Sequence, residues 1–343
     1  MQAGTKTERQ SNMELLRIFA VAGVIVLHFN AKALPAASGA TRWALLLLEM
    51  VSACAVNVFV MLSGYFLHRR QSVSIYKPLS LLLQLLVFRL VMHGIEIVLG
   101  RAEFTPEGLL LLLIPLDYFL VLYTALYMLS PYLNRLLALL DDRKFQQFLL
   151  LLVLLFSVWN YFGELLGSAT GLSFVSSSTI GIHGGQEGYT IVNFVLCYCL
   201  GAALGRGALA FSHPGWLFLG CLSAELLIAR HNMYLSIQYL NPFLICQAAC
   251  AVLLAGKLRF QNMAVNRAAG AALSVYMIHM HVLAYFDPAG CAGRGCIGAL
   301  ACLMGIILTI YAAGIAAHFL YETAARPVRS AILKHIRFPE ISL

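Results

Sequence analysis

Long apolar runs separated by short polar segments are the feature that most restricts what this chain can fold into. In residues 79–90 and 109–116 aliphatic side chains follow one another almost without interruption, and more apolar residues flank each run. A helix of about 20 mostly apolar residues crosses the hydrocarbon core of a bilayer. The alternation of apolar and polar residues typical of membrane β-barrels is absent. The sequence therefore predicts an all-α, polytopic transmembrane helix bundle.

The composition agrees with a membrane protein and argues against a soluble one. Hydrophobic residues make up 61% of the chain and charged residues 11%, whereas about a quarter of the residues in a soluble domain are charged. The net charge of +8 does not indicate nucleic-acid binding, because excess Lys and Arg in a membrane protein gather in cytoplasmic loops. Membrane lipid is therefore an expected partner and nucleic acid is not.

Run length predicts about ten spans within a single membrane-embedded domain that occupies residues 1–343. The expected spans are residues 13–32, 44–66, 79–99, 109–130, 146–162, 190–209, 214–229, 239–256, 269–286 and 297–320. The seventh is the weakest, because it is short and contains Glu225. An even number of spans places both termini on the same side of the membrane.

Lys and Arg are distributed unevenly between the two sides of such a bundle. Sixteen fall on the side of the termini: Lys6, Arg9, Arg69, Arg70, Lys77, Arg135, Arg143, Lys144, Arg206, Lys257, Arg259, Arg267, Arg326, Arg329, Lys334 and Arg337. Five fall on the other side: Lys32, Arg42, Arg101, Arg230 and Arg294. Because cytoplasmic loops carry the excess of Lys and Arg, both termini are expected in the cytoplasm.

Three local features leave alternatives open. Ala31-Lys32-Ala33 resembles a signal-peptide cleavage site, but cleavage would leave nine spans and spoil the charge alternation. The longest outer loop, at about 163–189, is rich in Gly and Ser and is either a flap over an outer opening or a connector. Cys291 and Cys296 share another outer loop, where a disulfide is possible in an oxidising compartment.

Arg17 and His28 frame the apolar centre of the first span. No polar residue lies among the ten that separate them. On a helix the two side chains lie roughly 16 Å apart along the axis and point to nearly the same face. Arg17 is then at the cytoplasmic end and His28 lies toward the outer leaflet. An ionisable group at that depth is costly, and by default it indicates a functional site.

The second span ends in a polar motif followed by a basic pair. Asn57, Ser63 and Tyr65 are candidate cavity residues within the span, and Arg69 and Arg70 emerge at its cytoplasmic end. The basic pair is either an ordinary positive-inside anchor or, together with Arg17, a clamp for phosphate, since guanidinium groups bind phosphate oxygens in pairs.

The third span places Arg89, His93 and Glu96 at i, i+4 and i+7, so they share one helical face. Because lipid would not tolerate that face, it is expected to point into the protein. It forms either a structural ion pair of Arg89 with Glu96 or another helix, or part of a functional cavity.

The ninth span contains Tyr276, His279 and His281, and the two histidines lie close to the expected depth of His28. Three histidines at one depth predict a shared polar cavity. Asp117 in the fourth span is a candidate to bind a polar acceptor or to pair with a buried cation.

In order, these motifs resemble the acyltransferase-3 family of bacterial polytopic membrane O-acyltransferases. The residues that carry the resemblance are Asn12-x-Glu14-x-x-Arg17-x(10)-His28, then Phe59-x-x-x-Ser63-Gly64-Tyr65, then Leu129-Ser130-Pro131, then Tyr276-x-x-His279. They span nearly the whole chain, and the count of ten spans matches the family.

The resemblance implies transfer of an acyl group, usually acetyl, from cytoplasmic acyl-CoA to a hydroxyl of an extracytoplasmic glycan or glycolipid. It implies Arg17 and His28 as the catalytic pair, and Arg69 and Arg70 as residues that serve the acetyl-CoA donor. The expected location is the cytoplasmic (inner) membrane. Two features depart from the family: the basic pair is adjacent rather than separated by one residue, and Asp117-Tyr118-Phe119 stands where relatives often have a tryptophan.

The residues themselves are compatible with this chemistry and with one rival. A histidine titrates near neutrality, so His28 suits a general base, and an acyl-histidine intermediate is the alternative mechanism. A transporter or flippase of a small solute or a lipid-linked sugar would use the same buried polar groups as a path. No internal inverted repeat supports that reading, and no zinc-binding or other metal-binding motif occurs.

Overall fold

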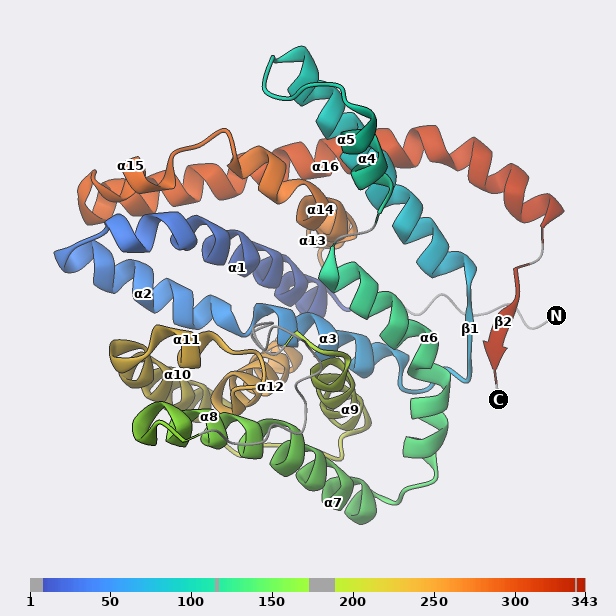
Figure 1. Ribbon diagram of the computed structural model, residues 1–343. Helices are drawn as coiled ribbons and strands as arrows, with labels where there is room; N and C mark the ends of the chain where they lie inside the picture. Colours follow the sequence, from blue (N-terminus) through green and yellow to red (C-terminus); the bar gives the residue numbers. More distant parts are fainter. Residues whose placement is uncertain (1–8, 115–116, 173–188, 337, 343) are drawn as a thin grey trace.

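The computed structural model describes residues 9–114, 117–172, 189–336 and 338–342, and the described chain is a bundle of α-helices (Figure 1). Within it, seven helical segments are long and apolar enough to cross a membrane, and two shorter apolar helices accompany them. The predicted all-α, polytopic membrane fold is confirmed.

Helices of the first half of the chain are α1 (Ser11–Ala36), α2 (Gly39–Ala53), α3 (Ala55–Leu67), α4 (Tyr76–Val98), α5 (Pro106–Leu113), α6 (Tyr118–Ala138), α7 (Asp142–Val153), the π-helical turn η1 (Leu154–Val158) and α8 (Trp159–Thr170). The second half contains α9 (Ile191–Arg206), α10 (Pro214–His231), α11 (Met233–Ile237), α12 (Pro242–Lys257), α13 (Met263–Gly270), α14 (Ala272–Leu283), α15 (Pro288–Ala292) and α16 (Gly295–His335). Two short strands complete it, β1 (Ser72–Ser74) and β2 (Glu340–Ser342).

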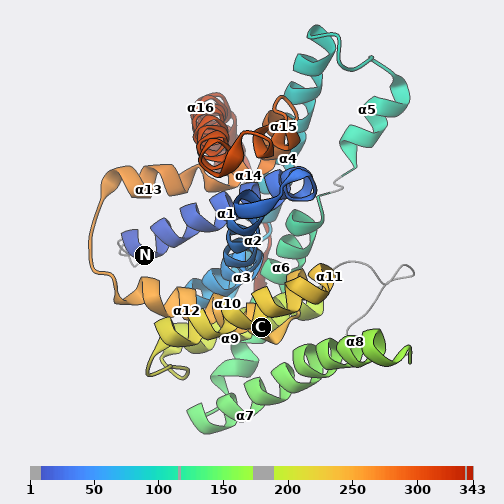
Figure 2. The same ribbon diagram turned by 90° about the vertical axis from the view of Figure 1, so that its left-hand side faces the viewer.

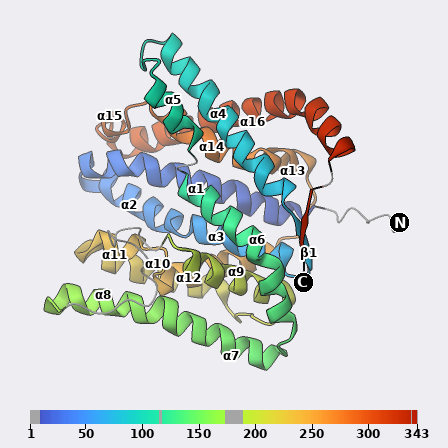
Figure 3. The same ribbon diagram turned by 45° about the vertical axis from the view of Figure 1, so that its right-hand side comes forward.

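α1, α2 and α3 form the middle of the bundle. Seen end-on, they lie between α14 to α16 on one side and α9, α10 and α12 on the other (Figure 2). The start of α1 lies at the same end of the bundle as β1 and β2, and α15 and the turn from α1 to α2 lie at the opposite end (Figures 1 and 3). This arrangement agrees with termini on one side, and the assignment of that side to the cytoplasm stays a prediction.

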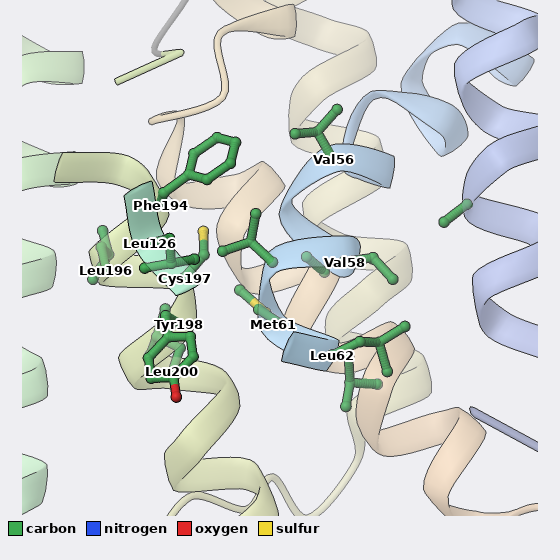
Figure 4. Close-up of a cluster of buried hydrophobic side chains, with 14 of the residues drawn as sticks. Val56, Val58, Met61, Leu62, Leu126, Phe194, Leu196, Cys197, Tyr198 and Leu200 are labelled. Carbon is green, nitrogen blue, oxygen red and sulfur yellow. The ribbon is translucent and has the colours of Figure 1, made fainter. Parts of the chain in front are cut away.

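The tightest helix packing joins α3 to α9, and it explains the glycine in the Ser63-Gly64-Tyr65 motif. A methyl group on Gly64 would meet the carbonyl of Tyr198, and one on Gly201 would meet the carbonyl of Met61. The side chains around this crossing are fully buried (Figure 4). Small residues let membrane helices approach backbone to backbone, which compensates for the lack of a hydrophobic driving force in lipid.

All ten predicted spans fall on helices, but several bounds are wrong. The fourth is not one helix, because α5 ends at Leu113 and α6 begins at Tyr118. Ile114 has extended dihedrals (φ −83°, ψ 122°), as expected for a residue that precedes a proline. Asp117 then starts α6 as its N-cap rather than lying within a span.

Other spans differ in length. The fifth runs from α7 through η1 to α8 and continues to Thr170, so the expected loop at 163–189 begins later, and its residues 173–188 lie outside the described chain. The eighth starts as a helix only at Pro242, after α11. The tenth belongs to α16, which is 41 residues long and continues well past residue 320. The seventh, α10, is not among the seven long apolar segments.

The disulfide of the described chain joins Cys291 to Cys302, and Cys296 is free. The disulfide pairing of Cys291 with Cys296 that the sequence suggested is therefore wrong. Cys291 lies in α15 and Cys302 in the first turns of α16, so the bond ties the short helix α15 to the long helix α16.

The last strand, β2, lies beside the segment that follows the second span. β2 pairs with β1 in antiparallel register, with Ser72 opposite Ser342 and Ser74 opposite Glu340. Tyr76 also packs on Phe338, with ring centroids 5.1 Å apart. The C-terminal end is thus fastened directly after the Arg69–Arg70 pair.

Candidate functional site

His28 and His279 lie side by side between α1 and α14. Their ring centroids are 5.0 Å apart, and His279 is only 5% exposed. The Nδ1 of His279 is hydrogen-bonded to the backbone carbonyl of Tyr276, so this nitrogen carries the proton and Nε2 is the acceptor. That Nε2 is buried and has no partner in the described part of the chain. Of the three histidines, His28 and His279 lie together and His281 pairs with Glu96 instead, and the cavity predicted for them stays a prediction.

Tyr276 connects the histidine pair to α6. Its ring lies 5.3 Å from that of His279, and its hydroxyl donates to Asp117 Oδ1 at 3.3 Å. The same oxygen of Asp117 accepts the Leu120 amide at 2.9 Å, which caps α6. Asp117, Tyr276, His279 and His28 thus form a row of polar side chains that crosses from α6 through α14 to α1.

Phe119 packs against this row and links it to the second-span motif. Its ring lies 5.1 Å from Tyr276 and 6.0 Å from Phe59. The motif residues after Phe59 face other partners. Ser63 donates to the carbonyl of Phe59 at 3.0 Å within its own helix, and the Tyr65 ring lies against Phe66.

Asn57 is a buried connector rather than a group open to substrate. Its amide nitrogen donates to the Tyr239 carbonyl at 2.9 Å, and its oxygen accepts from Asn193 at 3.1 Å. Because it is fully buried and both of its polar atoms are used, its contacts join α3 and α9 to the segment before α12.

Arg17 and Glu14 are paired. Nη1 of Arg17 lies 2.5 Å from Oε2 of Glu14, one turn earlier on α1. This ion pair neutralises much of the charge that the phosphate clamp requires of Arg17. His28 is eleven residues further on, about 16 Å along the helix axis, so Arg17 and His28 do not touch the same atoms.

Arg69 lines a cavity of about 390 Å³ with His68, Asn134 and Arg206. Arg206, which our sequence analysis counted only as a loop charge, is held by Asp142 at 2.9 Å and by two backbone carbonyls. The backbone carbonyl of Arg70 accepts a hydrogen bond from Asn134, one of the cavity residues, at 2.7 Å.

His68 is the histidine of this cavity, and it lies directly after the end of α3, outside the predicted spans. Burial lowers its pKa, and the nearby guanidinium groups of Arg69 and Arg206 add to the effect.

The three polar side chains on this face of α4 have different surroundings. Glu96 pairs with His281 of α14 at 3.1 Å. Arg89 donates to the carbonyls of Leu111 and Ile114 at the end of α5. His93 has a buried Nε2 without a partner among the described residues. The structural alternative of an Arg89–Glu96 pair is therefore wrong, and the partner of Glu96 is on another helix.

A further polar chain escaped our sequence analysis. Gln84 of α4 donates to Ser274 Oγ at 2.8 Å, and this hydroxyl lies 3.1 Å from Nδ1 of His318 on α16. His318 in the tenth span was the available signal, since a histidine within a span is uncommon.

Together these features define a polytopic, all-α membrane protein with a buried histidine pair and an adjacent Tyr–Asp contact. The family model of acyltransferase-3, described as an acyltransferase domain, matches residues 10–317. The chain belongs to this family and is a membrane acyltransferase. Comparison with curated proteins and with solved structures gave no match.

Proposed function

We propose that this protein is an O-acyltransferase of the bacterial cytoplasmic membrane that moves an acyl group, most simply acetyl, from cytoplasmic acyl-CoA to a hydroxyl of an extracytoplasmic glycan or glycolipid. The observation that carries the proposal is the contact of His28 with His279 inside the helix bundle. The family match supports acyl transfer over the transporter or flippase alternative.

The proposed reaction needs one base and one route for the proton. The acceptor hydroxyl attacks the thioester carbonyl carbon, a C–O bond forms, and the C–S bond breaks. His28 takes the hydroxyl proton and returns it to the departing thiolate, so CoA leaves as the thiol. In the rival mechanism an imidazole nitrogen first takes the acyl group and then passes it to the hydroxyl.

His279 is suited to support this step. The Tyr276 carbonyl fixes its tautomer and leaves Nε2 as an acceptor, on a ring whose centroid lies 5.0 Å from that of His28. A neutral acceptor beside His28 lowers the cost of a transient charge on that ring, because hydrogen bonds to charged groups are stronger than those between neutral groups.

The proposal also assigns binding roles. Arg17 sits too far from His28 to meet the reacting atoms, so we assign it to the donor, together with Arg69 and Arg70. Tyr276 and Asp117 lie next to the pair and suit an incoming polar acceptor, because a carboxylate accepts hydrogen bonds from sugar hydroxyls.

The test compares surface glycans from cells that carry the wild type or His28→Ala. Acyl groups present in the wild type and absent in the variant, by mass analysis, are the expected result. Transfer of labelled acetyl from acetyl-CoA by the purified protein should fall by about a hundredfold to ten-thousandfold if His28 moves a proton.

The matched control is His231→Ala, an exposed histidine at the end of α10. It should leave acylation unchanged. Wild-type acylation by a folded His28→Ala protein would remove His28 from the mechanism. An acylated peptide trapped around His28 would favour the acyl-histidine route.

A further inference from the structure

A second basic cavity lies at the same end of the bundle as the start of α1, where α13, α16 and Arg9 meet. Its volume is about 500 Å³, and Arg9, Asn266, Arg267, His318 and Glu322 are among its lining residues. Cavities of a few hundred Å³ are the size that holds small-molecule ligands. The sequence alone indicates only positive-inside anchors for Arg9 and Arg267.

The arginines of this cavity keep their charge available. Arg9 donates to the Asn266 carbonyl at 2.9 Å, a neutral partner, and lies against Gly270. Within the described chain neither Arg9 nor Arg267 forms an ion pair with a carboxylate. Glu322 in the cavity wall is paired with Arg329 at 2.6 Å. The cavity is therefore positive overall and suited to phosphate oxygens.

The arginines of the predicted phosphate clamp are less free to bind phosphate than those of this cavity. Arg17 is paired with Glu14, and Arg206 beside Arg69 is paired with Asp142. Each of these pairs must be broken or shared before the guanidinium can bind phosphate at full strength, and this lowers the affinity of the clamp for phosphate.

The cavity is also directly connected to the helix that carries His279. α13 runs into α14 with one residue between them, and His318 of the cavity lies 3.1 Å from Ser274 of α14. Ser274 is five residues before His279, about 7.5 Å along the helix axis. The inner wall of the cavity and the histidine pair are therefore joined by less than two turns of one helix.

We propose that the α13–α16 cavity binds the phosphate-bearing nucleotide end of acyl-CoA, with Arg9 and Arg267 as its phosphate contacts and His318 at its inner wall. This inference rests on the proposed function, since it assumes that acyl-CoA is the donor. It moves the main charge contact from the Arg69–Arg70 pair to two arginines that the sequence motifs do not include.

The test measures binding of adenosine 3′,5′-bisphosphate, and separately of CoA, to the purified full-length protein in an uncharged detergent. Arg267→Ala and Arg9→Ala should each raise the Kd for both probes about tenfold or more. Arg259→Ala is the matched control, because Arg259 is an exposed arginine in the loop just before α13 and outside the cavity lining. It should leave both constants unchanged.

A gain in affinity provides a test that misfolding cannot imitate. Glu322→Gln removes the negative charge of the cavity wall and frees Arg329, so it should tighten binding of the bisphosphate severalfold. Weaker or unchanged binding in Glu322→Gln, together with normal binding in Arg267→Ala, would overturn the inference.

Other outcomes separate the inference from the function it rests on. Loss of CoA binding in Arg69→Ala with normal binding in Arg267→Ala would return the coenzyme to the predicted clamp and keep the proposed function. Retention of phosphatidylglycerol that depends on Arg267, without bisphosphate binding, would assign the cavity to a lipid headgroup and overturn it. Failure of the wild type to bind CoA at all would instead count against the donor of the proposed function.

Discussion

His279 and His281 of α14 have different partners, and this difference predicts unequal effects when each is replaced. His279 is buried and fixed by the Tyr276 carbonyl, whereas His281, two residues later, pairs with Glu96 on the far side of α14. His279→Gln should therefore lower turnover by about a hundredfold or more while CoA binding stays normal.

His281→Gln is the matched control on the same helix, and it should cost far less turnover. Rates of labelled acetyl transfer at saturating donor measure both. Equal losses in the two variants would show that His279 acts through general packing of α14 and not through its neighbour His28.

His68 predicts a pH effect outside the membrane. Burial lowers its pKa from the ordinary value of 6.5 in the folded protein. The neutral form is then favoured by folding, so its contribution to stability is present above pH 6.5 and is lost as the pH falls toward the lowered pKa. The Tm in detergent should decline over this acidic range.

His68→Gln should weaken that acid-side decline, since Gln carries no titratable proton. His213→Gln, an exposed histidine before α10, should leave it unchanged. Tm measured at a series of pH values gives the comparison, and parallel curves for the wild type and His68→Gln would contradict the role of His68.

At the level of residues, the sequence predicted the histidine pair better than its surroundings. Counting positions from the ends of two spans was enough to place His28 and His279 at one depth. It could not show that Asp117 and Tyr276 meet, because that contact depends on which helices are neighbours. It also could not separate Arg267 from an ordinary loop charge, since loop arginines have the same composition signal whether or not they line a cavity.

The α3–α9 crossing is the element-level feature that most limits substitution. Gly64→Ala and Gly201→Ala should each destabilise the protein by about 1–3 kcal/mol, because the added methyl group meets a backbone carbonyl that cannot move independently of its helix. Gly220→Ala on α10 is the control, because a methyl group there meets nothing.

Thermal unfolding in detergent measures these three variants. We expect a lower Tm for the first two, and an unchanged or slightly higher Tm for Gly220→Ala, since alanine favours helix over glycine by up to about 1 kcal/mol. A normal Tm for Gly64→Ala would mean that the crossing can open without loss.

Helix positions followed from apolar run length, and helix ends did not. Ile114 takes extended dihedrals before a proline inside an apolar run, where hydropathy alone gives no stop. The extension of α16 past residue 320 is the opposite case. Its polar residues end the hydrophobic signal, but alanines and arginines continue a helix well, so the helix outlasts the span.

The orientation of the whole molecule is open to a direct test. The charge distribution predicts that the end of α8 faces outside and the α6–α7 turn faces the cytoplasm. Gly171 has φ 74°, so the side chain of a cysteine there would be strained, and Ser168 is the better outer position. Ser168→Cys should react with an impermeant thiol reagent in intact cells, in a background without native cysteines.

Asp141→Cys in the α6–α7 turn should react only after the membrane is opened. Labelling of position 141 in intact cells would invert the molecule and place the arginines of the α13–α16 cavity on the side without coenzyme.

The pairing of β2 with β1 also sets the order in which the molecule can be completed. β1 leaves the ribosome early, directly after the third helix, but β2 follows only after α16, so this junction stays open until β2 has been made. Every helix between the two strands is made while β1 is still unpaired. A bulky segment joined directly to β2 would then lie next to the newly closed junction. An affinity tag fused to β2 is therefore expected to disturb this junction.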